Sequence, residues 1–87
     1  MTPHTWEIAL WAERRLECAT TATIHIPVGP TRSAWDKEVT LYAEILALSI
    51  YADEDPPGLV SNGWKYIDPH ALLDWLRAKK AKKEGDA

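Results

Sequence analysis

The side chains that could perform acid–base, nucleophilic or metal chemistry are few in this 87-residue chain, and they lie far apart. The three histidines, His4, His25 and His70, lack the i, i+4 spacing with which two imidazoles on one helix face bind a metal ion. The single cysteine, Cys18, falls near the expected end of a helix, where the negative end of the helix dipole disfavours the thiolate. We therefore expect no catalytic residue, no metal site and no cofactor, and interpret the chain as a non-enzymatic protein.

Two other patterns that often mark binding sites are incomplete. The four glycines are scattered, which excludes a glycine-rich loop that cradles phosphate. Asp53, Glu54 and Asp55 form an acidic run, but the spacing of an EF-hand calcium loop is missing. The run is interpreted as a solvated loop, which Pro56 and Pro57 stiffen.

Charge is distributed unevenly along the chain, whose net charge is −3. Residues 1–64 contain four basic and nine acidic side chains, whereas residues 65–83 contain six basic and two acidic ones. A basic stretch of this kind complements the negative end of a helix dipole, or it forms a patch that contacts nucleic acid. We prefer the first interpretation.

The length fits one domain, for which we expect a compact body over residues 1–78 and a charged C-terminal tail over residues 79–87. A lone cysteine is typical of a reducing compartment, and the first residues lack the basic and apolar regions of a signal peptide. The longest apolar-rich stretch, residues 39–52, is too short to cross a bilayer. These features predict a soluble, cytoplasmic protein that does not contact membranes.

The N-terminal half predicts a helix, a strand and a second helix. Apolar residues recur at helical spacing over residues 5–18, and apolar and polar residues then alternate over residues 21–28, as in an edge strand. The longest helix is expected over residues 33–52, where Ser33 and Asp36 resemble a capping box. Its second half is apolar nearly all round, so we expect that half in the core.

The C-terminal third predicts a hairpin and a closing helix. Two β-prone runs within residues 59–67 flank Asn62-Gly63, a pair typical of a type I′ turn. Asp68-Pro69 then suits the N-cap and first position of a helix. The expected class is α+β, in the order α-β-α-β-β-α, with a three-stranded antiparallel sheet packed on helices. The inward face of the closing helix is expected to consist of Leu72, Leu73, Trp75 and Leu76.

The stretch from Pro56 to Leu76 resembles the wing and closing helix of excisionase-type winged-helix proteins. It combines a proline-containing turn, a hairpin and a helix that ends in Trp75-Leu76. The resemblance implies a winged-helix-like order, with the helix over residues 33–52 broken in two, and DNA binding through a recognition helix and a wing. Residues 38–63 contain no lysine or arginine, whereas contact with phosphate requires cations.

The leading functional hypothesis is therefore a small regulatory or inhibitory protein of phage or mobile-element type that binds a protein partner. Acidic surfaces can block basic, nucleic-acid-binding surfaces, and tryptophan is enriched at interfaces. A basic nucleic-acid-binding protein is thus the kind of partner that we expect. The expected partner-binding residues are Glu38, Glu44, Asp53, Glu54, Asp55 and Trp35.

Two alternatives remain open at this point. One is an excisionase-like DNA-binding protein that acts in recombination or transcription, and the other is a homo-oligomer formed through the apolar half of the long helix. The residues that would contact DNA in the first alternative are Lys65, Arg77, Lys79, Lys80, Lys82 and Lys83.

Overall fold

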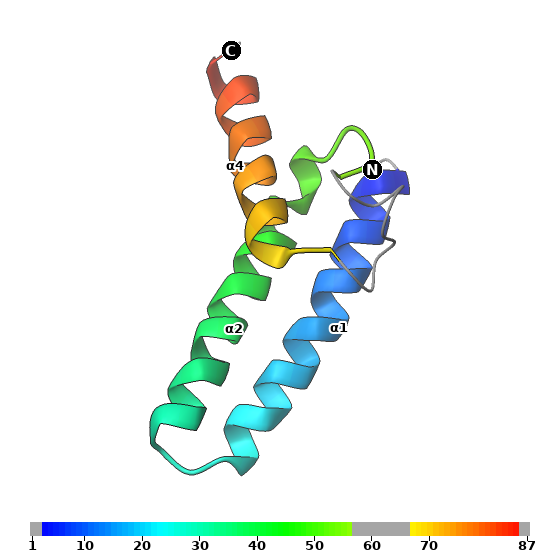
Figure 1. The fold of residues 1–87 in the computed structure, drawn as a ribbon. Helices are drawn as coiled ribbons and strands as arrows, with labels where there is room; N and C mark the ends of the chain where they lie inside the picture. Colours follow the sequence, from blue (N-terminus) through cyan, green and yellow to red (C-terminus); the bar gives the residue numbers. More distant parts are fainter. Residues whose placement is uncertain (1–2, 57–66, 86–87) are drawn as a thin grey trace.

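The computed structural model describes residues 3–56 and 67–85, and every regular element within these ranges is a helix (Figure 1). The elements are α1 (Pro3–His25), α2 (Pro30–Leu48), the 3-10 helix η1 (Ser49–Tyr51) and α4 (Pro69–Gly85). α1 and α2 form an antiparallel hairpin, and α4 lies beside the C-terminal half of α2 (Figure 1). The expected α+β class, with its three-stranded sheet and winged-helix-like α-β-α-β-β-α order, is therefore wrong: the described chain is all-helical.

The strand expected over residues 21–28 is wrong because α1 continues through this segment to His25. The β-branched residues there are accommodated within the helix, and the Thr23 hydroxyl donates a hydrogen bond to the Thr20 carbonyl oxygen at 2.7 Å. The helix ends just before Pro27, whose ring disfavours helical geometry at the preceding residue. Ile24, one of the apolar residues of that alternation, is 74% exposed on the helix.

α2 begins three residues earlier than expected, at Pro30, where a missing N–H costs no intrahelical hydrogen bond. The capping box expected at Ser33 is wrong, because Ser33 already lies inside the helix and its N–H donates to the Gly29 carbonyl oxygen at 3.0 Å. The chain then tightens into η1, where the Ser49 hydroxyl donates to the Leu46 carbonyl oxygen at 2.7 Å.

The closing helix is confirmed, together with its N-cap. The His70 N–H donates to the Asp68 side-chain oxygen at 2.9 Å, as expected for a residue that caps the first turn after Pro69. Of the side chains expected to face inward, Trp75 is partly buried and the three leucines are buried. α4 continues as a helix to Gly85. The buried leucines are Leu72, Leu73 and Leu76.

The hairpin expected over residues 59–67, with its Asn62-Gly63 turn, lies outside the described residues except for Ile67. Ile67 is buried in the hydrophobic core, two residues before α4 begins. Of the stretch that resembles excisionase-type proteins, the structure describes Pro56 and residues 67–76, in which the closing helix begins at Pro69 as expected.

The hydrophobic core lies where α1, the C-terminal half of α2, η1 and α4 meet. Its side chains of lowest exposure are Ile8 of α1, Ile45 of α2, and Leu72 and Leu76 of α4, all 2% exposed or less. No residue of α2 from position 30 to position 38 is buried. We call the two ends of the α1–α2 hairpin the covered end, where α4 packs, and the open end, which contains the α1–α2 turn.

Candidate protein-binding groove

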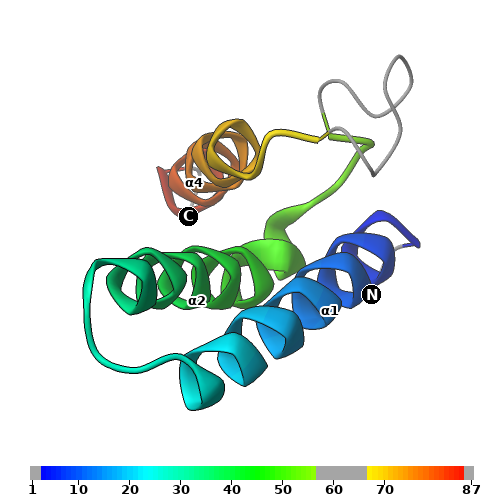
Figure 2. The ribbon, with the colours of Figure 1, turned by 60° about the horizontal axis from the view of Figure 1, so that its bottom comes forward.

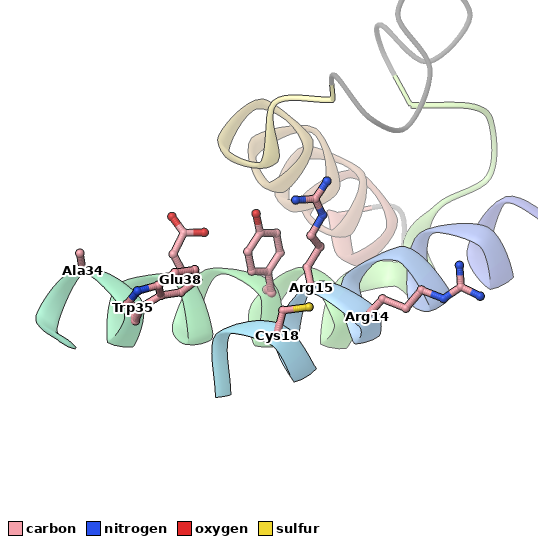
Figure 3. A pocket seen from close by; sticks show the side chains of 7 residues that line it. Arg14, Arg15, Cys18, Ala34, Trp35 and Glu38 are labelled. Atoms are coloured by element: carbon pink, nitrogen blue, oxygen red, sulfur yellow. The ribbon is translucent and has the colours of Figure 1, made fainter. Parts of the chain in front are cut away.

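A groove of about 540 Å³ lies between α1 and α2 toward the open end of the hairpin (Figure 3). Each helix contributes one face, because residues three and four positions apart lie on the same side of a helix. We call this hollow the aromatic groove. Its lining residues are Arg14, Arg15, Cys18, Ala34, Trp35, Glu38 and Tyr42.

Tyr42 lines the inner end of the aromatic groove and connects it to the core. Trp11 and Tyr42 meet edge to face, with ring centroids 5.6 Å apart and planes at 76°. The Arg15 guanidinium carbon lies 5.8 Å from the centre of the Trp11 ring, within the range of a cation–π contact. Tyr42 is only 8% exposed, whereas Trp35, toward the outer end of the groove, is 37% exposed. The groove therefore combines the buried ring of Tyr42 with the more accessible ring of Trp35.

Burial is the largest cause that raises the pKa of the Tyr42 phenol above its ordinary value of 10.0. The negative charge of Glu38 and its hydrogen bond with the phenol raise this pKa further, while the positive charge of Arg15 opposes them. The phenol is therefore neutral at physiological pH and can donate or accept a hydrogen bond. Arg15 and Glu38 rise from α1 and α2 toward the same side of the hairpin (Figure 3).

The α1 wall of the aromatic groove is cationic. Arg14 and Arg15 stand between this groove and a second hollow of about 300 Å³, which Glu7, Leu10 and Trp11 also line. Within residues 3–56 and 67–85, neither guanidinium forms an ion pair with a carboxylate. Their charges are thus available to an incoming group.

The structure divides the expected partner-binding residues into two sets. Trp35 and Glu38 line the aromatic groove. The other four are at the covered end or in the segment that follows it, and each is paired within the chain. Their contacts are Glu44 with Arg77 at 2.7 Å, Asp53 with Lys79 at 2.9 Å, Glu54 with Lys79 at 3.0 Å, and Asp55 with His4 at 2.8 Å.

The residues expected to contact DNA take part in the same pairs. A hydrogen bond with Lys79 is the largest cause that lowers the pKa of Asp53, and hydrogen bonds with Asp53 and Glu54 raise the pKa of Lys79. Arg77 forms a two-pronged contact with Glu44, which raises the pKa of the guanidinium. Lys80 lies 3.8 Å from Glu84, and Lys82 and Lys83 are exposed. Lys65, the last residue of that set, lies outside the described residues.

The three histidines remain apart in the fold. His4 and His25 lie near opposite ends of α1, and His70 lies in the first turn of α4. Among the described residues, no three histidine, cysteine, aspartate or glutamate side chains gather in a way that could hold a metal ion. None of the described helices is both long and apolar enough to cross a membrane.

Sequence reasoning missed the α1 side of the groove, which includes Arg14, Arg15 and Cys18. A signal for it was present. Arg14 and Arg15 are the only adjacent basic residues before position 79, and they follow Trp11 by three and four positions. This spacing places an aromatic ring and two cations on one helix face.

Comparisons with protein-family models, with curated proteins and with solved structures found no match.

Proposed function

We propose that this protein is a small, non-enzymatic regulatory or inhibitory protein of phage or mobile-element type that binds a protein partner in the aromatic groove. The observation that carries the proposal is the accessible Trp35 beside two arginines that have no carboxylate partner in the described chain. Tryptophan, tyrosine and arginine are the residues most enriched among those that dominate binding energy at interfaces.

The composition of the groove favours a protein partner over a small polar substrate. Its aromatic side chains offer apolar area, while Arg14, Arg15 and Glu38 supply charges at the rim. Protein interfaces commonly have such an apolar centre and polar edge. The groove contains no histidine, and its one cysteine has no histidine beside it, so it lacks the nucleophile–base arrangement of covalent catalysis.

The acids at the covered end are not part of the proposed binding surface. Glu44, Asp53 and Glu54 contact cations of α4 and hold that helix against α2 and the segment after η1. Binding through these carboxylates would first require breaking these contacts. Of the residues first expected to bind a partner, the proposal therefore retains Trp35 and Glu38.

Site-specific photo-crosslinking tests the proposed function. A photoreactive amino acid is placed at Ala34, which lines the groove, or at Ala71, which is also exposed but lies on α4. We expect cells that produce the protein to give a cross-linked partner from position 34 and not from position 71. The partner is then purified and titrated against the wild type and the Trp35→Ala variant.

Loss of Trp35 should weaken binding of the purified partner by about 30-fold or more, the effect typical of a central aromatic anchor. A partner that cross-links only from position 71, or that binds the Trp35→Ala variant as tightly as the wild type, would place the binding surface elsewhere.

A further inference from the structure

The aromatic groove continues the surface on which α4 packs. On α2, Ala34, Glu38, Tyr42 and Ile45 follow one another at helical spacing, so they form one stripe along the helix. The C-terminal part of this stripe belongs to the core to which α4 contributes, and its N-terminal part lines the groove. Figure 2 shows α4 stacked on α2, and Figure 1 shows that α4 starts only midway along the hairpin.

α1 contributes a matching stripe. Ile8 is fully buried in the core, Trp11 packs at its edge, and Arg15 and Cys18 then line the groove. The stripe on α2 is thus covered by α4 at one end and uncovered at the other, and the stripe on α1 runs beside it. An element that packed in the groove would contact both α1 and α2, whereas α4 packs mainly on α2 and η1.

The size of the uncovered stretch suits a short helix. Ala34 and Tyr42 are eight positions apart on α2, which corresponds to about 12 Å, or roughly two helical turns. Such a helix would present apolar side chains at i, i+3, i+4 and i+7 to Trp35 and the edge of the Trp11–Tyr42 pair. The groove volume of about 540 Å³ is enough for several such side chains.

The charged residues of the groove determine whether acidic or basic side chains of a partner would be favoured beside it. The cations of α4 that reach the covered end, Arg77 and Lys79, are paired with carboxylates. Arg14 and Arg15 have no such partner among the described residues, and the acid of the opposite wall, Glu38, is engaged with Tyr42. At the covered end, carboxylates and the cations of α4 neutralise one another. Acidic side chains along the edge of a bound helix that faces α1 would pair with Arg14 and Arg15 in the same way.

We infer that the groove binds an amphipathic α-helix of a partner protein, about two to three turns long, with an apolar face and an acidic edge. The bound helix lies on the α1–α2 hairpin in line with α4, and its carboxylates face Arg14 and Arg15. This inference rests on the proposed function and names the chemistry of the partner.

A displayed peptide library tests the inference. Its members share a helical pattern of fixed apolar positions, and the flanking positions vary among aspartate, glutamate, lysine, arginine and serine. Selection on the wild-type protein should enrich aspartate and glutamate along one edge. Enrichment of lysine and arginine, or no enrichment at all, would overturn the inference.

Two matched double variants identify the residues that select the acidic edge. Arg14→Gln/Arg15→Gln and Arg32→Gln/Lys37→Gln each remove two positive charges, but only the first changes the groove. An enriched acidic peptide should bind the first variant about ten-fold more weakly, with a reduced dependence on salt, and the second as it binds the wild type. Equal effects of the two variants would overturn the inference.

Two further measurements separate this inference from the proposed function and from self-association. If the cross-linked partner binds through Trp35 but acidic peptides are not enriched, the proposed function stands and the acidic-helix inference fails. Sedimentation equilibrium should show a monomer. A dimer that dissociates on Trp35→Ala substitution would make a second copy of the chain the occupant and overturn the inference.

Discussion

The apolar stripes of α1 and α2 are buried in the core at the covered end of the hairpin and line an exposed groove at the open end. At the covered end, Ile8 and Ile45 are fully buried in the core to which α4 contributes, and carboxylates of α2 and the following segment pair with cations of α4. At the open end, Trp35 and Val28 are exposed, at 37% and 89%, and two arginines have no carboxylate partner in the described chain. One end is complete within the chain, whereas the other offers apolar area and unpaired charge.

An apolar stripe on a helix does not by itself identify the core. The stripe on α2 becomes core only where a third helix reaches it. Stability should therefore depend on substitutions at the covered end, and partner binding on substitutions at the open end.

Truncation of the core at the covered end should have the largest effect on stability. Ile45→Ala removes buried methyl groups and leaves a cavity between α1, α2 and α4, which should cost about 2–5 kcal/mol. Urea unfolding followed by circular dichroism measures this cost. Ile50→Ala is the control, because Ile50 is 64% exposed and its truncation should change stability by less than about 0.5 kcal/mol. Similar losses for the two variants would contradict the described core.

Truncation at the open end should separate binding from folding. Trp35→Ala should reduce partner affinity by about 2 kcal/mol or more, because the ring is accessible in the groove. The same variant should lose less than about 1 kcal/mol of unfolding free energy, since few core atoms lose contacts. Calorimetric titration and urea unfolding measure the two quantities. Trp6→Ala, a 62% exposed ring outside the groove, should leave affinity unchanged, and a comparable loss there would contradict the assignment.

The ion pairs of the covered end should make stability depend on acid pH. The pKa of Asp53 is lowered from 3.8, so this carboxyl stabilises the folded protein above pH 3.8, and the contribution is lost as the pH falls through the folded-state pKa. Urea midpoints at about pH 6 and about pH 3 should therefore differ less for Asp53→Asn than for the wild type. Asp36→Asn, at an exposed carboxyl outside the ion pairs of the described chain, should follow the wild type. Identical pH responses of wild type and Asp53→Asn would show that the Lys79 contact is not stabilising.

The contact between Glu44 and Arg77 should have the smallest effect. Glu44→Gln should lower the melting temperature slightly at low salt, and the difference should shrink as salt screens the pair. Scanning calorimetry at two salt concentrations measures this. Glu13→Gln serves as the comparison, because Glu13 is exposed and forms no ion pair within the described residues. A salt-independent difference for Glu44→Gln would argue that the carboxylate acts by something other than its charge.

The features predicted correctly from sequence are those set by neighbouring residues. The closing helix follows from the Asp68-Pro69 cap and the spacing of Leu72 and Leu76, and all of these signals are local. The strand over residues 21–28 was predicted wrongly because alternation favours a strand only if another strand pairs with it. Among the described residues no strand lies beside this segment, and the chain continues the hydrogen bonding of α1.

The candidate site was harder to predict because it depends on contacts between distant parts of the chain. Glu44 and Arg77 are 33 positions apart, so the sequence does not reveal that the acid is already paired. The aromatic groove likewise joins residues near position 15 to residues near position 38, and only the turn between α1 and α2 brings them together. Trp35 and Glu38 were found from sequence, whereas the arginines opposite them were not.

Protection of Cys18 from alkylation tests most directly the claim that the open end is the binding surface. Cys18 is the single cysteine of the sequence, is exposed, and lines the aromatic groove. The partner at 100 times its Kd should slow its alkylation by about 100-fold, because only the free fraction reacts. In a Cys18→Ser/Ala78→Cys variant, whose thiol lies on the exposed side of α4, the partner should leave the rate unchanged. Unhindered alkylation of Cys18 in the complex, together with protection of the cysteine at position 78, would contradict the account and place the partner on α4.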